Sequence, residues 1–129
     1  MTIAHHTVRA NGIRQHYLDA GEGPRVILLH GFPEASFAWR HQIPVLSTRF
    51  RVIAPDLRGY GETDKPATGY DKRNMARDIV ELARSLGIET FAPVGHDRGA
   101  RVATRLAKDH PQIVDRLVVM DNVPARLVS

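Results

Sequence analysis

The sequence predicts an α/β protein with a doubly wound, mostly parallel sheet of six strands, and three observations support this prediction. Short apolar runs at 26–29 and 91–94 are typical of strands that are buried on both faces of a parallel sheet. Apolar residues at helical spacing over 71–86 and 98–110 predict two helices. Strands and helices alternate from residue 26 onward, which is the order that a parallel sheet with crossover helices requires.

The N-terminal segment predicts an antiparallel hairpin at one edge of the sheet. Residues 7–10 and 13–18 flank Asn11-Gly12, a dipeptide that favours a type I′ turn. The remaining strands are expected at 26–29, 50–54, 91–94 and 114–121. Asp56 and Arg58 follow the 50–54 strand closely, and we expect them to form a local structural pair.

The helices are expected at 35–46, 71–86 and 98–110. Pro44 should kink the first helix or end it, because proline lacks the backbone donor that a helix interior needs. Phe37 and Trp39 are among the apolar positions of this helix, and we place Trp39 in the core. Asp71 is a plausible N-cap for the second helix, and Gly87 is suited to the position after its last turn.

The composition is that of one globular domain over residues 1–129, with 43% hydrophobic and 25% charged residues. The sequence holds no cysteine, which excludes disulfides and thiolate chemistry. No apolar run is long enough to span a bilayer, and the N-terminus lacks the order of a signal peptide, so we expect a cytoplasmic protein without membrane partners. The basic residues behind the net charge of +4 are scattered, so nucleic acid is not expected as a partner. The histidines are not spaced as metal ligands, so neither a metal nor another cofactor is expected.

The stretch 94–101 is the part of the chain that points to a function. Gly95-x-Asp97-x-Gly99 lies between an apolar run and a helical pattern, which is the spacing of a nucleophile elbow with aspartate in place of serine. Glycines are needed beside so sharp a turn because a Cβ atom there would clash with the strand and helix that meet. The turn is expected to raise the Asp97 carboxylate above the sheet at a helix N-terminus, where negative charge is favoured.

Three further motifs agree with this stretch. They are His30-Gly31-Phe32-Pro33, Asp56-Leu57-Arg58-Gly59-Tyr60-Gly61 and Val119-Met120-Asp121. Together with the elbow they resemble the α/β-hydrolase superfamily, and within it the group of the haloacetate (fluoroacetate) dehalogenases and the epoxide hydrolases. The resemblance implies the N-terminal part of an α/β-hydrolase sheet, comprising strands one to six.

The resemblance also implies roles for individual residues. Asp97 would be the nucleophile, and the backbone N–H groups of Phe32 and Arg98 would form the oxyanion hole. In the haloacetate dehalogenases an Asp-Arg-x-x-Arg arrangement holds the carboxylate of the substrate, and here it is formed by Asp97, Arg98 and Arg101. Epoxide hydrolases usually carry an aromatic residue at the position of Arg98.

The two arginines support this role on physical grounds as well. Arg98 and Arg101 are three residues apart and share a helix face, so both guanidinium groups can converge on one carboxylate. The planar fork of an arginine matches a carboxylate better than a lysine ammonium does. The alternative is that they form surface ion pairs with Asp109 or Asp115, or only solvate the helix.

The rest of a catalytic triad is less complete in this sequence. The resemblance implies that Asp121, at the end of the last strand, orients a catalytic histidine, whereas a turn or cap role is the alternative for an aspartate there. None of the seven histidines matches the place of the catalytic histidine, which follows the final strand in the family. The cap domain of the family is also expected beyond this chain.

We therefore expect hydrolytic dehalogenation of a short 2-haloacid, a small anionic substrate, through an alkyl ester of Asp97. Epoxide hydrolysis by the same Asp97 is one alternative. A truncated, non-catalytic fragment is the other alternative, because none of the histidines matches the catalytic one and we therefore do not expect the chain by itself to turn over. An unpaired strand at the edge of the sheet would then favour self-association.

Overall fold

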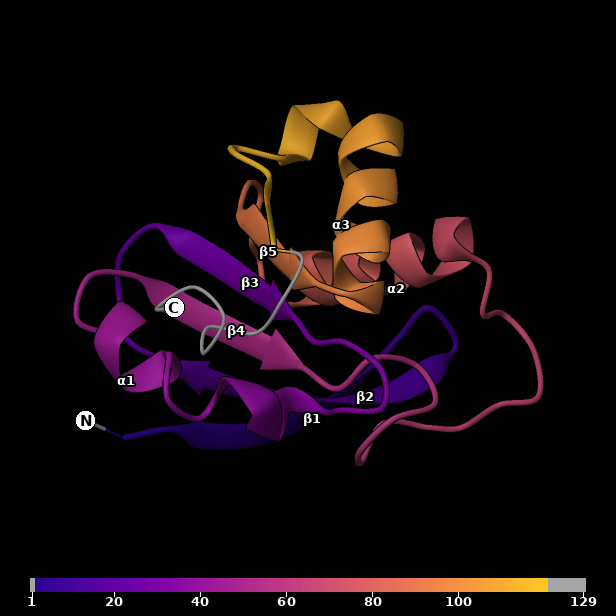
Figure 1. The fold of residues 1–129 in the computed structure, drawn as a ribbon, viewed down its shortest axis with the longest axis horizontal. Helices are drawn as coiled ribbons and strands as arrows, with labels where there is room; N and C mark the ends of the chain where they lie inside the picture. The colour runs from indigo at the N-terminus through magenta and orange to yellow at the C-terminus, as the bar shows by residue number, and fades with distance from the viewer. Residues whose placement is uncertain (1, 121–129) are drawn as a thin grey trace.

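The computed structural model describes residues 2–120 and contains one six-stranded sheet. Its strands are β1 (Ala4–Ala10), β2 (Ile13–Ala20), β3 (Arg25–Leu29), β4 (Arg51–Pro55), β5 (Ala92–His96) and β6 (Val118–Met120). They lie in the order β1-β2-β4-β3-β5-β6, with β1 antiparallel to β2 and β2 antiparallel to β4 (Figure 1). The pairs β4–β3, β3–β5 and β5–β6 are parallel, which confirms the predicted mostly parallel sheet.

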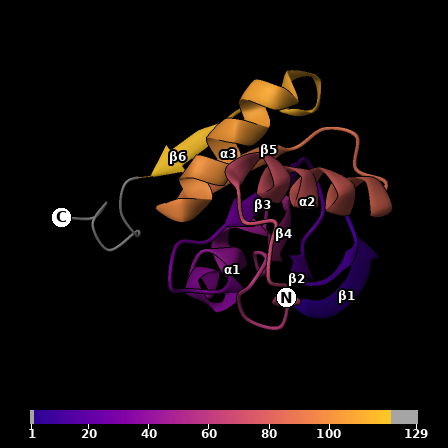
Figure 2. The ribbon, with the colours of Figure 1, turned by 90° about the vertical axis from the view of Figure 1, so that its right-hand side faces the viewer.

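Helices cover both faces of this sheet. The helices α2 (Lys72–Ser85) and α3 (Arg98–Asp109) pack on one face, and a 3₁₀ turn and α1 (Ile43–Leu46) lie on the other (Figure 2). Successive residues of β3 alternate between the two layers, because Ile27 and Leu29 join the core under α2 and α3 while Leu28 joins the core with Trp39. The doubly wound α/β class is therefore confirmed.

The predicted hairpin and the predicted ends of α2 are confirmed. Asn11 and Gly12 have φ angles of 53° and 77°, as a type I′ turn requires. The Asp71 side chain accepts a hydrogen bond from the N–H of Asn74 at 3.1 Å and caps α2. At the other end Gly87 has a φ of 71°, and the N–H of Ile88 donates to the Ala83 carbonyl at 2.9 Å, which is a Schellman arrangement.

The prediction of one helix over 35–46 is wrong. The segment forms the 3₁₀ turn Ser36–Trp39 and, separately, the four-residue α1. Pro44 lies in the first turn of α1 rather than at a kink or an end, because a proline at the start of a helix interrupts no hydrogen bond. Trp39 is buried as predicted, whereas Phe37 is 68% exposed.

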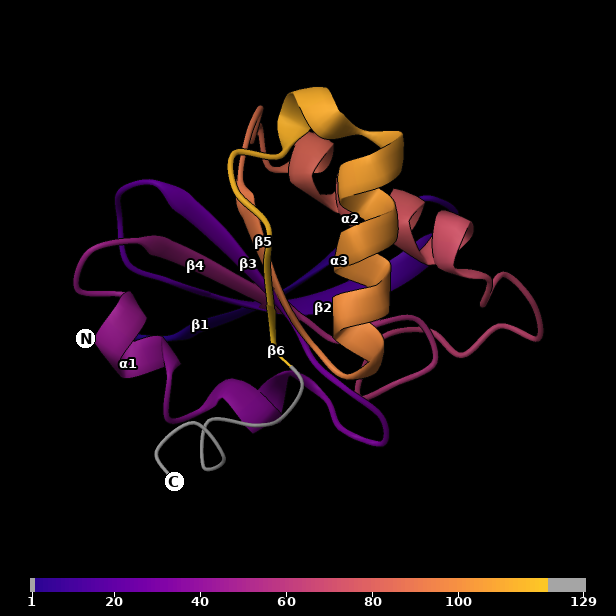
Figure 3. The same ribbon diagram turned by 45° about the horizontal axis from the view of Figure 1, so that its top comes forward.

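The last strand begins later than the predicted residue 114. Among the described residues of this segment, Val118–Met120 pairs with β5 as a strand, and Val114 makes an isolated bridge to Phe91. Figure 3 shows β6 running along β5 beside α3. Among residues 2–120, β6 pairs with β5 alone, and no helix is long and apolar enough to cross a membrane.

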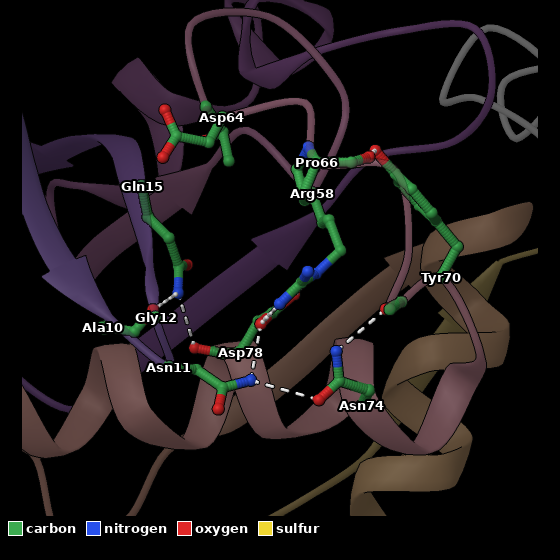
Figure 4. A network of polar contacts seen from close by, with 12 residues as sticks. Ala10, Asn11, Gly12, Gln15, Arg58, Asp64, Pro66, Tyr70, Asn74 and Asp78 are labelled. Carbon is green, nitrogen blue, oxygen red and sulfur yellow. Dashed lines mark hydrogen bonds and ion pairs between the residues drawn. The ribbon is translucent and has the colours of Figure 1, made fainter.

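A buried ion pair that was not predicted from the sequence holds the loop between β4 and α2 against α2. The Arg58 guanidinium donates to both carboxylate oxygens of Asp78 on α2, at 2.8 and 2.9 Å (Figure 4). The Asn11 amide joins Asp78 at 2.8 Å, so the hairpin turn is attached to the same carboxylate. The side chains of Arg58 and Asp78 are only 7% and 4% exposed.

The expected pairing of Asp56 with Arg58 is therefore wrong. Asp56 instead accepts hydrogen bonds from the His16 ring at 2.8 Å and from the backbone N–H groups of Ser36 and Glu62. These bonds lower the pKa of Asp56 despite its burial. Asp56 thus joins β2, the 3₁₀ turn and the loop that follows β4.

The Arg58–Asp78 pair generates the first prediction. Replacing Arg58 by methionine should lower the free energy of unfolding by about 3–5 kcal/mol, because it leaves a buried carboxylate without its charged partner. Urea unfolding followed by circular dichroism measures this loss. Arg84→Met, which breaks the more exposed pair of Arg84 with Glu81, is the matched control and should cost less than about 1 kcal/mol. Equal losses in the two variants would contradict a stabilising role for the buried pair.

Candidate active site

The predicted site lies where β5 turns sharply into α3. Asp97 connects the two elements with φ of 56° and ψ of −118°, a left-handed conformation that is rare for residues other than glycine. The Asp97 side chain is exposed above the end of the sheet. Its N–H faces the Met120 carbonyl at 3.5 Å, so the turn is also joined to β6.

The flanking glycines have the steric role that the sequence predicted. A Cβ atom on Gly99 would lie 2.6 Å from the His30 carbonyl oxygen, and one on Gly95 would lie 2.6 Å from the Cα atom of Ala100. Neither neighbour can move away, because both are backbone atoms. The turn therefore needs glycine at both positions.

The turn after β3 brings a hydrogen-bond donor to Asp97. The backbone N–H of Phe32 donates to Oδ2 of Asp97 at 3.1 Å. This bond, and then the N–H of Arg98, holds the pKa of the Asp97 carboxyl below its ordinary value of 3.8. A lowered pKa keeps the carboxylate ionised at neutral pH, which is the form that a nucleophile needs.

His30 fixes the position of the same turn, a role that was not predicted from the sequence. The ring is 1% exposed; its Nε2 accepts the N–H of Leu57 at 2.9 Å, and its Nδ1 lies 2.9 Å from the Gly31 carbonyl. Because Nε2 is an acceptor, the proton is assigned to Nδ1, which donates to Gly31. Burial lowers the pKa of His30 and keeps this neutral form.

The two arginines lie beside Asp97 in different settings. The Arg98 guanidinium lies 4.9 Å from the centre of the Phe32 ring and donates to the Tyr60 hydroxyl at 3.3 Å. Arg101 is exposed, and its positive charge contributes to the lowered pKa of Asp97. The contact of Arg98 with Tyr60, which lies 38 residues earlier in a motif quoted from the sequence, was not predicted.

The alternative of surface ion pairs is not what the described residues show. Asp109 pairs with Arg73 and Arg105, each at 3.3 Å. Within residues 2–120, neither Arg98 nor Arg101 forms an ion pair with Asp109 or Asp115. Both guanidinium groups therefore lack an acidic partner in the described part of the chain.

Other candidate groups around Asp97 are few. Nδ1 of His96 lies 3.7 Å from a carboxylate oxygen of Glu34. In the described part of the chain no group of three histidine, aspartate or glutamate side chains could hold a metal ion. Asp121, the predicted orienting acid, lies outside the described residues.

This arrangement agrees with comparisons to known proteins. Residues 24–128 match the family model of the alpha/beta hydrolase fold, and the chain belongs to this family. It is 48% identical over 122 residues to a soluble epoxide hydrolase of Corynebacterium sp. (strain C12), covering 95% of this chain and 43% of that protein. It is also 46% identical over 109 residues to a fluoroacetate dehalogenase of Burkholderia sp., covering 81% of this chain and 36% of that protein.

Solved structures give the same result. The epoxide hydrolase CorEH superposes with a TM-score of 0.91 at 48% identity, over 93% of this chain and 42% of that one. An epoxide hydrolase of Vigna radiata superposes with a TM-score of 0.88 at 45% identity, over 91% of this chain and 38% of that one. The chain thus spans about two fifths of the length of these relatives.

The contact between the turn and Asp97 generates the second prediction. Gly31→Ala should raise the pKa of Asp97 toward 3.8, because the new Cβ atom would lie 2.7 Å from Cβ of Asp97 and would push the Phe32 donor away. Titration of the Asp97 side-chain carboxyl by ¹³C NMR measures the pKa. Gly87→Ala is the control for general destabilisation far from Asp97, because its Cβ atom would meet no atom within 4 Å while its φ of 71° strains any residue other than glycine. An unchanged pKa in Gly31→Ala would show that the Phe32 donor does not hold the carboxylate.

Proposed function

We propose that Asp97 is the nucleophile of a hydrolase that displaces halide from a short 2-haloacid. The observation that carries this proposal is the placement, beside the exposed Asp97 carboxylate, of two arginines that have no acidic partner among residues 2–120. The 95–99 turn then acts as a nucleophile elbow. The relatives include both a fluoroacetate dehalogenase and epoxide hydrolases, which supports nucleophilic chemistry at this turn.

In the first step a carboxylate oxygen of Asp97 attacks the carbon that bears the halogen. A new C–O bond forms as the C–halogen bond breaks, and the halide leaves with the bonding electrons. The products are an alkyl ester of Asp97 and a free halide ion. The pKa of Asp97, held low by the N–H groups of Phe32 and Arg98, ensures that the attacking group is ionised.

In the second step water attacks the ester carbonyl of Asp97. The carbonyl oxygen becomes an oxyanion, and the backbone N–H groups of Phe32 and Arg98 stabilise this charge. The bond between the acyl carbon of Asp97 and the alkyl oxygen then breaks, a proton of the attacking water passes to this oxygen, the 2-hydroxyacid leaves, and Asp97 returns to a carboxylate. This step needs a general base to take the proton of the water, and the resemblance to the family assigns it to a histidine oriented by Asp121.

The arginines define the substrate class in this proposal. A haloacid carries a carboxylate on the carbon next to the halogen, so its charge must lie close to Asp97. Arg98 can offer a fork of donors from a position fixed by Phe32 and Tyr60, and Arg101 adds a second guanidinium one helical turn later. Together they would offset the repulsion between the substrate carboxylate and Asp97.

Epoxide hydrolysis is the second candidate. The same attack by Asp97 would break one C–O bond of an epoxide ring, the ring oxygen would take a proton and stay in the product, and hydrolysis of the ester would then yield a diol. The observation in its favour is the high identity to epoxide hydrolases, at 48% with the Corynebacterium protein. Arg98 and Arg101 favour an anionic substrate over an uncharged epoxide.

The third prediction tests the first step alone. Incubation with chloroacetate should add one carboxymethyl group to the chain, detected by intact mass and mapped to Asp97 by peptide sequencing. The adduct should accumulate if the chain by itself does not turn over, and Asp97→Asn should form none. An unchanged mass with chloroacetate but an adduct with a small terminal epoxide would favour the second candidate.

The arginine variants complete this experiment. Arg101→Gln should slow adduct formation from chloroacetate by about tenfold, the loss expected for one charged hydrogen bond, and should leave the epoxide reaction within about twofold. Arg77→Gln, on the exposed side of α2, is the matched control. Equal slowing with both reagents would argue against binding of the substrate carboxylate by Arg101.

The fourth prediction concerns self-association. We propose that the chain associates with a second copy along β6, because β6 pairs with β5 alone among residues 2–120 and Val118 is 37% exposed. The sedimentation coefficient should then rise with concentration. Val118→Lys should reduce this rise, whereas Val45→Lys on exposed α1 should not. A constant monomer at all concentrations would contradict the proposal.

A further inference from the structure

A basic cavity lies beside the candidate site, between the start of α2 and the exposed face of α3. The basic cavity has a volume of ≈ 360 Å³. Four basic side chains line it: Lys72, Arg101, Arg105 and Lys108. No acidic side chain of the described residues lines it, and Val119 forms an apolar wall.

The positive charge of the basic cavity is only partly compensated. Asp109 pairs with Arg105, but it also pairs with Arg73. Lys72, Arg101 and Lys108 form no ion pair among residues 2–120. Burial and the positive charges of Arg98 and Arg101 lower the pKa of Lys72, and the nearby Asp71 offsets this only in part. The cations are therefore close enough to repel one another, and a bound anion would relieve that repulsion.

The cavity is also connected to the candidate nucleophile. Arg101 lines the cavity, and its charge lowers the pKa of Asp97. Lys72 is close enough to Arg98 and Arg101 for both to affect its charge, although it lies 25 residues before Asp97 in the sequence. A ligand in the cavity would therefore lie next to the site rather than apart from it.

We propose that this cavity is a second anion-binding site, in which Lys72, Arg101 and Lys108 bind a small oxyanion such as a carboxylate or a phosphate. The oxyanion is either a free anion or the distal anionic group of a substrate whose reactive carbon lies at Asp97. The proposal rests on the proposed function only if the oxyanion is the distal group of a substrate. The apolar wall at Val119 would leave room for the carbon chain that joins the two groups of such a substrate.

The fifth prediction tests the site with inorganic phosphate as the probe. Titration of the ¹⁵N-labelled chain at constant ionic strength should shift the amide signals of residues 100–108 with a saturable curve. Lys72→Gln should weaken this binding by about tenfold, as expected for the loss of one charged hydrogen bond. Lys65→Gln is the matched control, because Lys65 lies in the loop before α2 and bonds to backbone carbonyls there. Equal binding in the two variants, or shifts spread over all basic residues, would overturn the proposal.

Two further reagents distinguish the sources of the oxyanion. If the site holds part of the substrate, Lys72→Gln should slow adduct formation from 2-chlorosuccinate, which has a distal carboxylate, and leave chloroacetate within about twofold. If the site holds a free anion, Lys72→Gln should weaken phosphate binding but leave the rate of adduct formation from both haloacids unchanged. Asp97→Asn should still bind phosphate, so failure of the proposed function and failure of this site give different results.

Discussion

The candidate site depends on the close approach of three backbone segments where α3 begins against the ends of β3 and β5. A Cβ atom on Gly99 would meet the Leu29 and His30 carbonyls, so only glycine allows α3 to start there. This packing holds Asp97 at a positive φ that an isolated turn would not keep. Because the segments meet so closely, the N–H of Phe32 comes within 3.1 Å of a carboxylate that lies 65 residues later in the sequence.

Most of the fold could be predicted because its signals are local. Asn11-Gly12 specifies its own turn, and Asp71 and Gly87 bound α2 through hydrogen bonds that span a few residues. The spacing of Gly95, Asp97 and Gly99 is similarly self-contained. The segment 35–46 was mispredicted because apolar spacing alone does not show that Pro44 begins a helix rather than ends one.

The partners of charged side chains could not be predicted in the same way. Arg58 was assigned to Asp56, two residues away, but pairs with Asp78, twenty residues away. Proximity in sequence carries no information about which of several carboxylates the fold brings to a buried guanidinium. The same limit applies to His30 with Leu57 and to Arg98 with Tyr60, whose contacts exist only after β3, β4 and α3 are assembled.

In this site backbone donors act on Asp97, whereas side chains at the rim would contact the substrate. The N–H groups of Phe32 and Arg98 would stabilise charge on Asp97 whatever electrophile it attacks, because they face the carboxylate and not the substrate. Selection between a haloacid and an epoxide must then come from side chains at the rim. Arg98 is held in place by Phe32 and Tyr60, so it would lose little conformational freedom on binding a carboxylate. An uncharged epoxide would gain nothing from this guanidinium, and the charge at the rim therefore argues for an anionic substrate more strongly than the shared fold does.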